Sequence, residues 1–355
     1  MLKFDEINLN VGQAARQVAA QPPRTVLILG ASARAACQSA RRAGLRPVAA
    51  DLFADRDLQS TCHCRPVDNS HQAWIAASQE LVSARTAWMY TGAFENRPQL
   101  VEQIANRLEL WGTPADSLPA ARDPSAIAAA LDAAGLPSLK VRLSPPPCNP
   151  SQHWLSKPLL GSAGHGIQTW PVRSGAGETK PTADANRTSY FQQRATGHTM
   201  SAVFLTDRTS TCLLGTTSQL VGCSFLGASA FGYCGSIGPL RLPESVTNQI
   251  VGIGAAVAAT GSVCGLFGID LIHDTRDAWL TEVNPRYTAS VEVLERALDI
   301  PFLAWHRWSC TCAAQTDPIS GGTPAGRSYK RVAAQPLKRL IAGKLIVYAH
   351  RDVIA

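Results

Sequence analysis

Four polar side chains near residue 280 of this 355-residue chain have the types and spacing of a metal site. Asp270 is the only charge in a short apolar run, Glu282 lies in a second run of strand length, and turn residues separate the two. This pattern predicts a β-hairpin whose paired strands direct both carboxylates the same way. Because side chains alternate along a strand, Asn284 lies on the face of Glu282.

Carboxylate and amide oxygens form a hard, all-oxygen set that suits Mg²⁺ better than Zn²⁺. The sequence therefore predicts a magnesium site at Asp270, Glu282 and Asn284, with the cation of Arg286 beside it. The alternative is that these acids only keep a hairpin soluble. An unpaired acid inside an apolar strand is rare, so the combination favours a functional site.

A lysine followed by a glycine-rich turn forms a second candidate site. Lys157 lies in a strand-like run, and the turn after it reads Gly-Ser-Ala-Gly-His-Gly from Gly161 to Gly166. Glycines let backbone N–H groups approach an anion, and the ammonium adds a point charge. No Gly-Lys-Ser/Thr ends the turn, so it is not a Walker loop. We therefore predict a phosphate site, with a surface hairpin as the alternative.

The elements that must position these groups begin with a β-α-β unit. Residues 25–30 and 46–51 have the pattern of buried strands, and a helix that ends before Gly44 separates them. This layout is typical of a doubly wound sheet. The full Gly-x-Gly-x-x-Gly fingerprint is missing, so the unit supports a dinucleotide site only weakly. A second unit follows, with a strand over 87–90 and a helix over 100–110.

The remaining pattern predicts a mixture of helices, short strands and glycine-rich connections. A glycine-rich loop over 231–239 and the side chain of Gln219 are expected to face a substrate. The other expected elements are helices over 122–134, 243–260 and 292–298 and strands over 139–143, 154–158, 190–196, 200–205, 213–221 and 344–349.

The composition is that of a folded protein with two or three subdomains, with 45% hydrophobic residues and a net charge of +7. Basic residues gather between 327 and 351, where they form a solvated face or attract an anionic substrate. No aromatic-interleaved basic motif accompanies them, so nucleic acid is not an expected partner.

The cysteines and the chain's start indicate a cytoplasmic protein with reduced thiols. Ten cysteines do not make a disulfide scaffold in a chain this long. The close pairs, Cys62/Cys64 and Cys310/Cys312, have a one-residue gap that is poor for zinc. Residues 250–269 are uncharged, but their glycines favour a helix and a buried strand over a membrane span.

Taken in order, these pieces resemble the ATP-grasp superfamily. The series contains the β-α-β unit, the helix before Gly135-Leu136-Pro137, Lys157 with its glycine-rich loop, the strand after Tyr190, and the acid Asp270 ahead of Glu-Val-Asn-Pro-Arg. It spans most of residues 25–300, and the Glu-Val-Asn-Pro-Arg ending is its most specific part. The series looks closest to carboxylase-related members from organisms with tetrahydromethanopterin-linked one-carbon chemistry.

The resemblance implies an α/β (α+β) fold in three parts. These are an N-terminal doubly wound pre-grasp domain over 1–118, a small lid subdomain over 119–190, and a C-terminal antiparallel-sheet subdomain over 191–355. ATP would lie between the last two, with Mg²⁺ as the metal and Mn²⁺ as the alternative. The partners would be small-molecule carboxylates and amines, with no nucleic acid or membrane, and a homodimer is one open alternative for the assembly.

The resemblance also assigns roles to individual residues. Lys157 would contact the α- and β-phosphates, and Arg286 would stabilise the transferring phosphoryl group or the acyl phosphate. Arg122 stands where the family usually has a lysine, and Gln192, Gln193 and Thr199 replace customary acids. The loop over the phosphates would comprise Gly161, Ser162, Ala163, Gly164 and Gly166, the adenine pocket Gln192, Gln193, Arg194 and Ala195, and the metal site Asp270, Glu282 and Asn284.

The activity implied is an ATP-dependent carboxylate–amine ligase that works through an acyl phosphate. Glutamate joined to a pterin- or furan-type one-carbon cofactor is the substrate pair that the family context suggests. One alternative is a carboxylase that activates bicarbonate. Another is a degenerate scaffold that binds nucleotide or a partner without turnover, which the missing lysine favours and the intact acidic set opposes.

Overall fold

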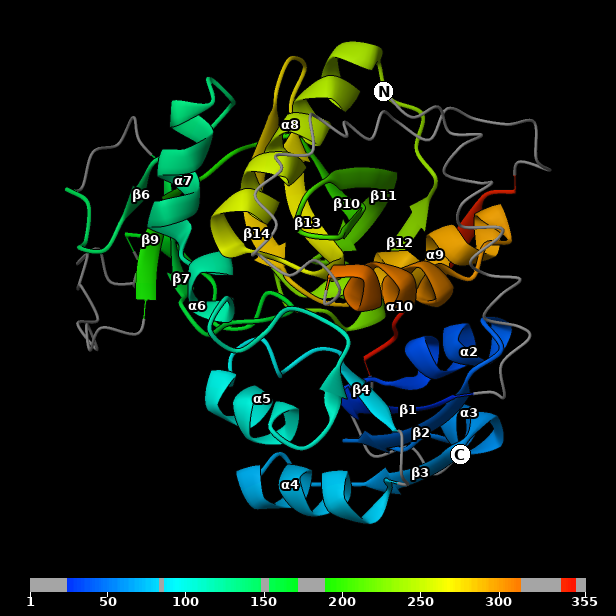
Figure 1. Cartoon of the computed structure of the whole chain (residues 1–355). Helices are drawn as coiled ribbons and strands as arrows, with labels where there is room; N and C mark the ends of the chain where they lie inside the picture. Colours follow the sequence, from blue (N-terminus) through cyan, green and yellow to red (C-terminus); the bar gives the residue numbers. More distant parts are fainter. Residues whose placement is uncertain (1–23, 83–85, 148–152, 172–188, 314–339, 349–355) are drawn as a thin grey trace, which may run out of the picture.

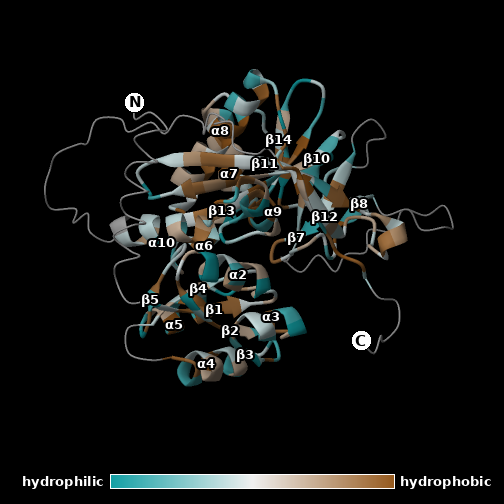
Figure 2. Cartoon of the chain, turned by 90° about the vertical axis from the view of Figure 1, so that its right-hand side faces the viewer, coloured by the Kyte–Doolittle hydropathy of each residue, from teal (hydrophilic) through white to brown (hydrophobic). Residues whose placement is uncertain are grey.

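The computed structural model describes residues 24–82, 86–147, 153–171, 189–313 and 340–348. It has the mixed α/β fold that was predicted, with one parallel sheet followed by two antiparallel sheets (Figure 1). Hydrophobic segments gather in the strands, whereas helix α3 (Arg56–Thr61) presents a hydrophilic surface (Figure 2).

The N-terminal domain contains a five-stranded parallel sheet with the order β3-β2-β1-β4-β5. The predicted β-α-β unit is confirmed, with β1 beside β2 in parallel. Its strands are β1 (Thr25–Gly30), β2 (Arg46–Asp51), β3 (His63–Pro66), β4 (Ala87–Tyr90) and β5 (Glu109–Leu110), and its other helices are α2 (Arg34–Arg42), α4 (His71–Glu80) and α5 (Pro98–Ala105).

Two loops leave the carboxyl edge of this sheet side by side, one after β1 and one after β4. The N–H of Ala31 donates to the Gly92 carbonyl at 2.9 Å, which joins the loops directly. The acid that ends β2, Asp51, accepts from the backbone N–H groups of Ala33 and Ala54 at 2.5 and 2.9 Å. Because parallel strands all end at this edge, the sheet holds both loops over the rest of the molecule.

A four-stranded sheet with the order β6-β9-β7-β8 forms the lid together with two short helices. The Asp123 side chain accepts from the N–H groups of Ser125 and Ala126, and Pro124 occupies the first turn, so the second helix begins there. The predicted boundary between residues 190 and 191 falls inside β9. The elements are α6 (Leu118–Ala121), α7 (Pro124–Ala133), β6 (Val141–Arg142), β7 (Trp154–Pro158), β8 (Gln168–Trp170) and β9 (Ser189–Gln193).

The C-terminal part is a six-stranded antiparallel sheet with the order β14-β13-β10-β11-β12-β15. One long helix, α8, packs on one face, and α9 and α10 pack on the other. The elements are β10 (His198–Thr206), β11 (Thr211–Val221), η1 (Ser224–Leu226), β12 (Tyr233–Gly238), α8 (Glu244–Gly261), β13 (Gly265–His273), β14 (Ala278–Asn284), α9 (Ala289–Leu298), α10 (Phe302–Ala313) and β15 (Ala342–Leu345).

One continuous core joins the N-terminal domain to this sheet. Val26 and Ile28 of β1 belong to the same buried cluster as Leu266 of β13, Leu294 of α9 and Phe302 of α10. Helices α9 and α10 therefore lie between the sheet and α2, as Figure 1 shows. This shared core fixes the loops after β1 and β4 relative to the antiparallel sheet.

Three predicted elements differ from the structure. The expected loop over 231–239 contains β12, which pairs with β11 and β15. The strand was not predicted because glycine has a low preference for strands. The helix expected over 100–110 ends at Ala105, and β5 begins at Glu109. The strand expected over 344–349 is β15, which begins at Ala342, and residue 349 lies outside the described residues.

The uncharged stretch over 250–269 forms the end of α8 and the start of β13. In the part of the chain that the structure describes, no helix has the length and apolar character needed to cross a membrane.

Candidate active site

The predicted hairpin exists and brings its polar groups together. In the register of β13 and β14, Asp270 lies opposite Glu282, and Gly268 lies opposite Asn284. The Asn284 amide nitrogen donates to Asp270 Oδ2 at 3.2 Å. The three predicted metal ligands are therefore neighbours on one face of the sheet.

Asp270 is the most perturbed of these groups. Its withdrawal from water, and next the charge of Glu282, raise its pKa to about 7. Gln219 Nε2 donates to Asp270 Oδ1 at 2.8 Å, and Ser201 lies opposite it on β10. Two carboxylates that repel each other beside an amide oxygen fit a divalent cation that prefers oxygen ligands. Among the described residues no group of three or more His, Cys, Asp or Glu side chains forms a metal cluster, so a softer, multi-ligand site is not present there.

Arg286 is held by groups from two parts of the chain. Its Nε donates to Glu95 Oε1 at 2.8 Å, and its Nη2 lies 2.8 Å from the same oxygen. Nη2 also donates to Asn284 Oδ1 at 3.0 Å, and Nη1 donates to the Tyr287 carbonyl at 3.2 Å. The sequence reasoning missed Glu95, which lies in the loop after β4.

Lys157 is buried, and neutral groups hold it. Its Nζ donates to Gln192 Oε1 at 3.1 Å and to the Thr281 carbonyl at 2.7 Å. Nζ also lies 5.7 Å from the centre of the Tyr190 ring. The strand pairing of β7 with β9 brings the predicted phosphate lysine and the first predicted adenine-pocket residue together.

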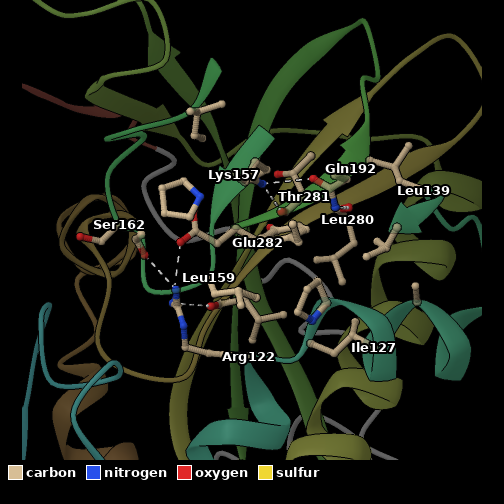
Figure 3. A pocket seen from close by; sticks show the side chains of 18 of the residues that line it. Arg122, Ile127, Leu139, Lys157, Leu159, Ser162, Gln192, Leu280, Thr281 and Glu282 are labelled. Carbon is tan, nitrogen blue, oxygen red and sulfur yellow. Dashed lines mark hydrogen bonds and ion pairs between the residues drawn. The ribbon is translucent and has the colours of Figure 1, made fainter. Parts of the chain in front are cut away.

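Arg122 lies between the glycine-rich loop and the hairpin (Figure 3). Its Nη2 donates to the Gly161 carbonyl at 2.8 Å, and its Nη1 donates to the Val283 carbonyl at 3.3 Å. Nη1 is also 3.7 Å from Glu282 Oε1. The guanidinium of Arg122 therefore lies next to a predicted metal ligand.

The glycine-rich loop packs closely against the start of β12. Gly164 has φ +80°, and a Cβ there would lie 1.8 Å from the Phe231 carbonyl oxygen. The N–H of Tyr233 donates to the Ala163 carbonyl at 3.4 Å. Asn96 Nδ2, from the loop after β4, donates to the Leu160 carbonyl at 2.9 Å. The lid is thus in contact with both other parts of the molecule.

These elements enclose a cleft of about 520 Å³, in the size range of ligand sites. A smaller branch of about 60 Å³ extends between α7 and β14 (Figure 3). Lys157, Gln192 and Glu282 line both. The main cleft is also lined by Ala31, Gly92, Ala93, Ser162, Ala163, Gly164, Gln193, Arg194, Ala195, Thr199, Gln219, Phe231, Tyr233, Asp270, Asn284 and Arg286.

Most predicted site residues thus lie on one cleft, with three exceptions. Gly161 and Arg122 line only the smaller branch, whereas Gly166 lies at the base of the loop against Pro158. The expected wall of basic tail residues falls mostly outside the described residues. Within them, Lys344 donates to Glu292 at 2.9 Å.

The sequence and the fold were compared with known proteins. Residues 126–290 match the family model described as the ATP-grasp domain. No curated protein matches the sequence.

Solved structures with the same fold include a biotin carboxylase, an N5-carboxyaminoimidazole synthetase and an L-amino acid ligase. The biotin carboxylase–β,γ-ATP complex from Campylobacter jejuni is 16% identical with a TM-score of 0.63, covering 82% of this chain and 72% of that one. The ADP complex of N5-carboxyaminoimidazole synthetase from Staphylococcus aureus is 14% identical with a TM-score of 0.61, covering 83% and 78%. The L-amino acid ligase from Bacillus licheniformis is 17% identical with a TM-score of 0.60, covering 80% and 73%.

Proposed function

The chain belongs to the ATP-grasp superfamily, and on that premise we propose that it is an ATP-dependent carboxylate–amine ligase. The observation that carries the proposal is one cleft onto which Lys157, Arg286 and the oxygen set of Asp270, Glu282 and Asn284 all open. In the reaction, a substrate carboxylate attacks the γ-phosphate of ATP in line, and ADP leaves. An amine then attacks the acyl phosphate, so an amide forms and phosphate is released.

The chain's own residues supply charge and position rather than a nucleophile. Lys157 would meet the phosphates with an ammonium whose hydrogen-bond partners among the described residues are neutral oxygens. Residues 192–195 line the cleft where β9 ends, which is the place proposed for the adenine. Asp270, Glu282 and Asn284 would hold Mg²⁺, which when bound neutralises charge on the phosphates.

The lid protects the reactive intermediate. The loop around Gly164 packs on Phe231 and, through Ala163, bonds to Tyr233. With substrates bound, that contact closes one side of the cleft and keeps water from the acyl phosphate.

Binding of Mg·ATP tests the proposal directly. Calorimetry should show binding to the wild type and binding at least tenfold weaker to Glu282→Ala, because a carboxylate ligand of the metal is lost. Glu102→Ala, at an exposed acid on α5, is the matched control and should bind as the wild type does. A folded wild type that binds no Mg·ATP would instead support a scaffold without turnover.

The acid and amine are then identified by ADP release from pairs of candidates. Glutamate with pterin- or furan-type one-carbon cofactors comes first in this screen, on the family resemblance stated above. A bicarbonate-activating carboxylase is the second candidate, because a biotin carboxylase shares the fold. Label from bicarbonate retained in the product would replace the ligase proposal with that candidate.

A further inference from the structure

Three groups of the protein hold the Arg286 guanidinium. A guanidinium carries five N–H groups. Glu95 accepts the Nε–H, Asn284 accepts one N–H of Nη2, and the Tyr287 carbonyl accepts one N–H of Nη1. Nη2 also lies 2.8 Å from Glu95 Oε1 as an ion pair. Among the described residues, the second N–H of Nη1 has no hydrogen-bond partner, so the side chain can offer it to the cleft that it lines.

Glu95 is placed to fix the direction of the free N–H on Arg286 Nη1. Its side chain is completely buried, and its partner is 191 residues away in the chain. Gly92, in the same loop, lies against the guanidinium, since a Cβ there would be 3.7 Å from Arg286 Cζ. The loop after β4 therefore fixes both the plane and the edge of the guanidinium.

Burial raises the pKa of Glu95 and the charge of Arg286 lowers it, and the balance keeps it below its usual value. The carboxylate is thus ionised at neutral pH, and its hydrogen bond and ion pair with Arg286 are charge-assisted. Its second oxygen, Oε2, is buried and has no hydrogen-bond partner among the residues that the structure describes. Buried ion pairs are weak sources of stability, and an unpartnered carboxylate oxygen makes this one weaker still. A contribution to folding stability therefore does not by itself explain the ion pair between Glu95 and Arg286.

We propose that Glu95 is a positioning residue of the active site: it holds the Arg286 guanidinium so that the free N–H of Nη1 faces the phosphoryl group during transfer. This rests on the ligase function proposed above. The same loop lines the cleft through Gly92 and Ala93 and contacts the lid through Asn96. The N-terminal domain thereby sets the geometry of a residue in the C-terminal hairpin.

Nuclear magnetic resonance of the Arg286 Nε–H, identified by its loss in Arg286→Gln, tests the contact without turnover. In the wild type the Nε–H should exchange slowly with solvent, and its signal should shift when Mg²⁺ and a non-hydrolysable ATP analogue are added. In Glu95→Gln, exchange should be at least tenfold faster and the shift should be lost. Asn96→Ala, in the same loop, is the matched control and should keep the slow exchange.

Kinetics tests the consequence. In Glu95→Gln, kcat for ADP release should fall about 100-fold, the size expected for one misplaced donor, while the Kd of Mg·ATP stays within threefold. The double variant with Arg286→Gln should be no slower than Arg286→Gln alone. A kcat within threefold of the wild type, or a double variant tenfold slower than Arg286→Gln, would overturn the proposal.

Two further results distinguish a failure of the positioning proposal from a variant that does not fold and from a failure of the ligase proposal. If Glu95→Gln does not fold, Glu95→Asp, which keeps the charge on a shorter side chain, should show the same division between kcat and Kd at about tenfold. If the wild type releases no ADP with any acid–amine pair, the ligase function fails. The shift of the Arg286 Nε–H signal on addition of the ATP analogue then tests whether Glu95 positions Arg286. A shift that persists in Glu95→Gln would refute the positioning role.

Discussion

Replacing Gly164 by alanine should open the glycine-rich loop. An alanine at φ +80° is disfavoured by roughly 1–2 kcal/mol in the left-handed region. Its Cβ would also lie 1.8 Å from the carbonyl oxygen of Phe231, and a backbone oxygen cannot rotate away. The loop must therefore leave Phe231 and lose the bond between Tyr233 and Ala163, which contributes roughly 0.5–1.5 kcal/mol.

The strain of roughly 1–2 kcal/mol falls on the packed loop alone, and by itself it lowers the population of the packed loop by a factor of roughly 5–30. If nucleotide binding needs the packed loop, the Kd of Mg·ATP should rise by a factor of that order, measured by calorimetry. Gly135→Ala is the matched control. Gly135 has φ +65° but no atom within 4 Å of a Cβ, so its variant should lose only about 1 kcal/mol of unfolding free energy and bind Mg·ATP normally. A Gly164→Ala variant that binds Mg·ATP within twofold of the wild type would show that the packed loop is not needed.

Three further predictions concern charged groups of the cleft and its smaller branch. Arg122→Ala should weaken Mg·ATP binding at least tenfold by calorimetry, whereas Arg122→Lys should bind within a few-fold of the wild type because the ammonium retains the charge. Equal binding by the two variants would show that the charge of Arg122 does not contribute to phosphate binding. With the pKa of Asp270 at about 7, protons compete with the metal, so Mn²⁺ binding followed by electron paramagnetic resonance should strengthen about fivefold from pH 6 to 7, reach about tenfold by pH 8 and then level off; a flat profile would contradict this. The raised pKa also means that the folded protein holds a proton which the unfolded chain releases between about pH 4 and 7, so the unfolding free energy should fall across that window, and Asp270→Asn should remove that fall.

The hairpin that carries Asp270 and Glu282 was predictable because everything that defines it is local. Two short runs and a turn specify the pairing, and the period of two then specifies the face on which Asp270 and Glu282 meet. The same holds for Lys157, whose strand and glycine-rich turn adjoin in sequence. Their burial and their partners could not be predicted, because β9 and β14 arrive from distant parts of the chain.

Two omissions have a different physical cause. Strand β12 contains Gly235 and Gly238, which carry little strand preference, and only its pairing with β11 and β15 makes it a strand. Glu95 follows an aromatic in a loop and has no local pattern that distinguishes it from a surface acid. Its partner Arg286 is 191 residues away in the chain, and no periodicity in the sequence reveals that contact.

The partners of Arg286, Arg122 and Lys157 bear on whether the site works. Glu95 neutralises Arg286, and Arg122 lies within 3.7 Å of Glu282. Lys157 differs, because its partners are the amide oxygen of Gln192 and a backbone carbonyl, neither of which carries a charge. The family's customary acid at residue 192 would form an ion pair with this lysine, whereas the glutamine orients the ammonium and leaves its charge available to phosphate. We therefore propose that the glutamine makes the predicted nucleotide site a stronger anion site, which favours the proposed ATP-binding enzyme over an inert scaffold.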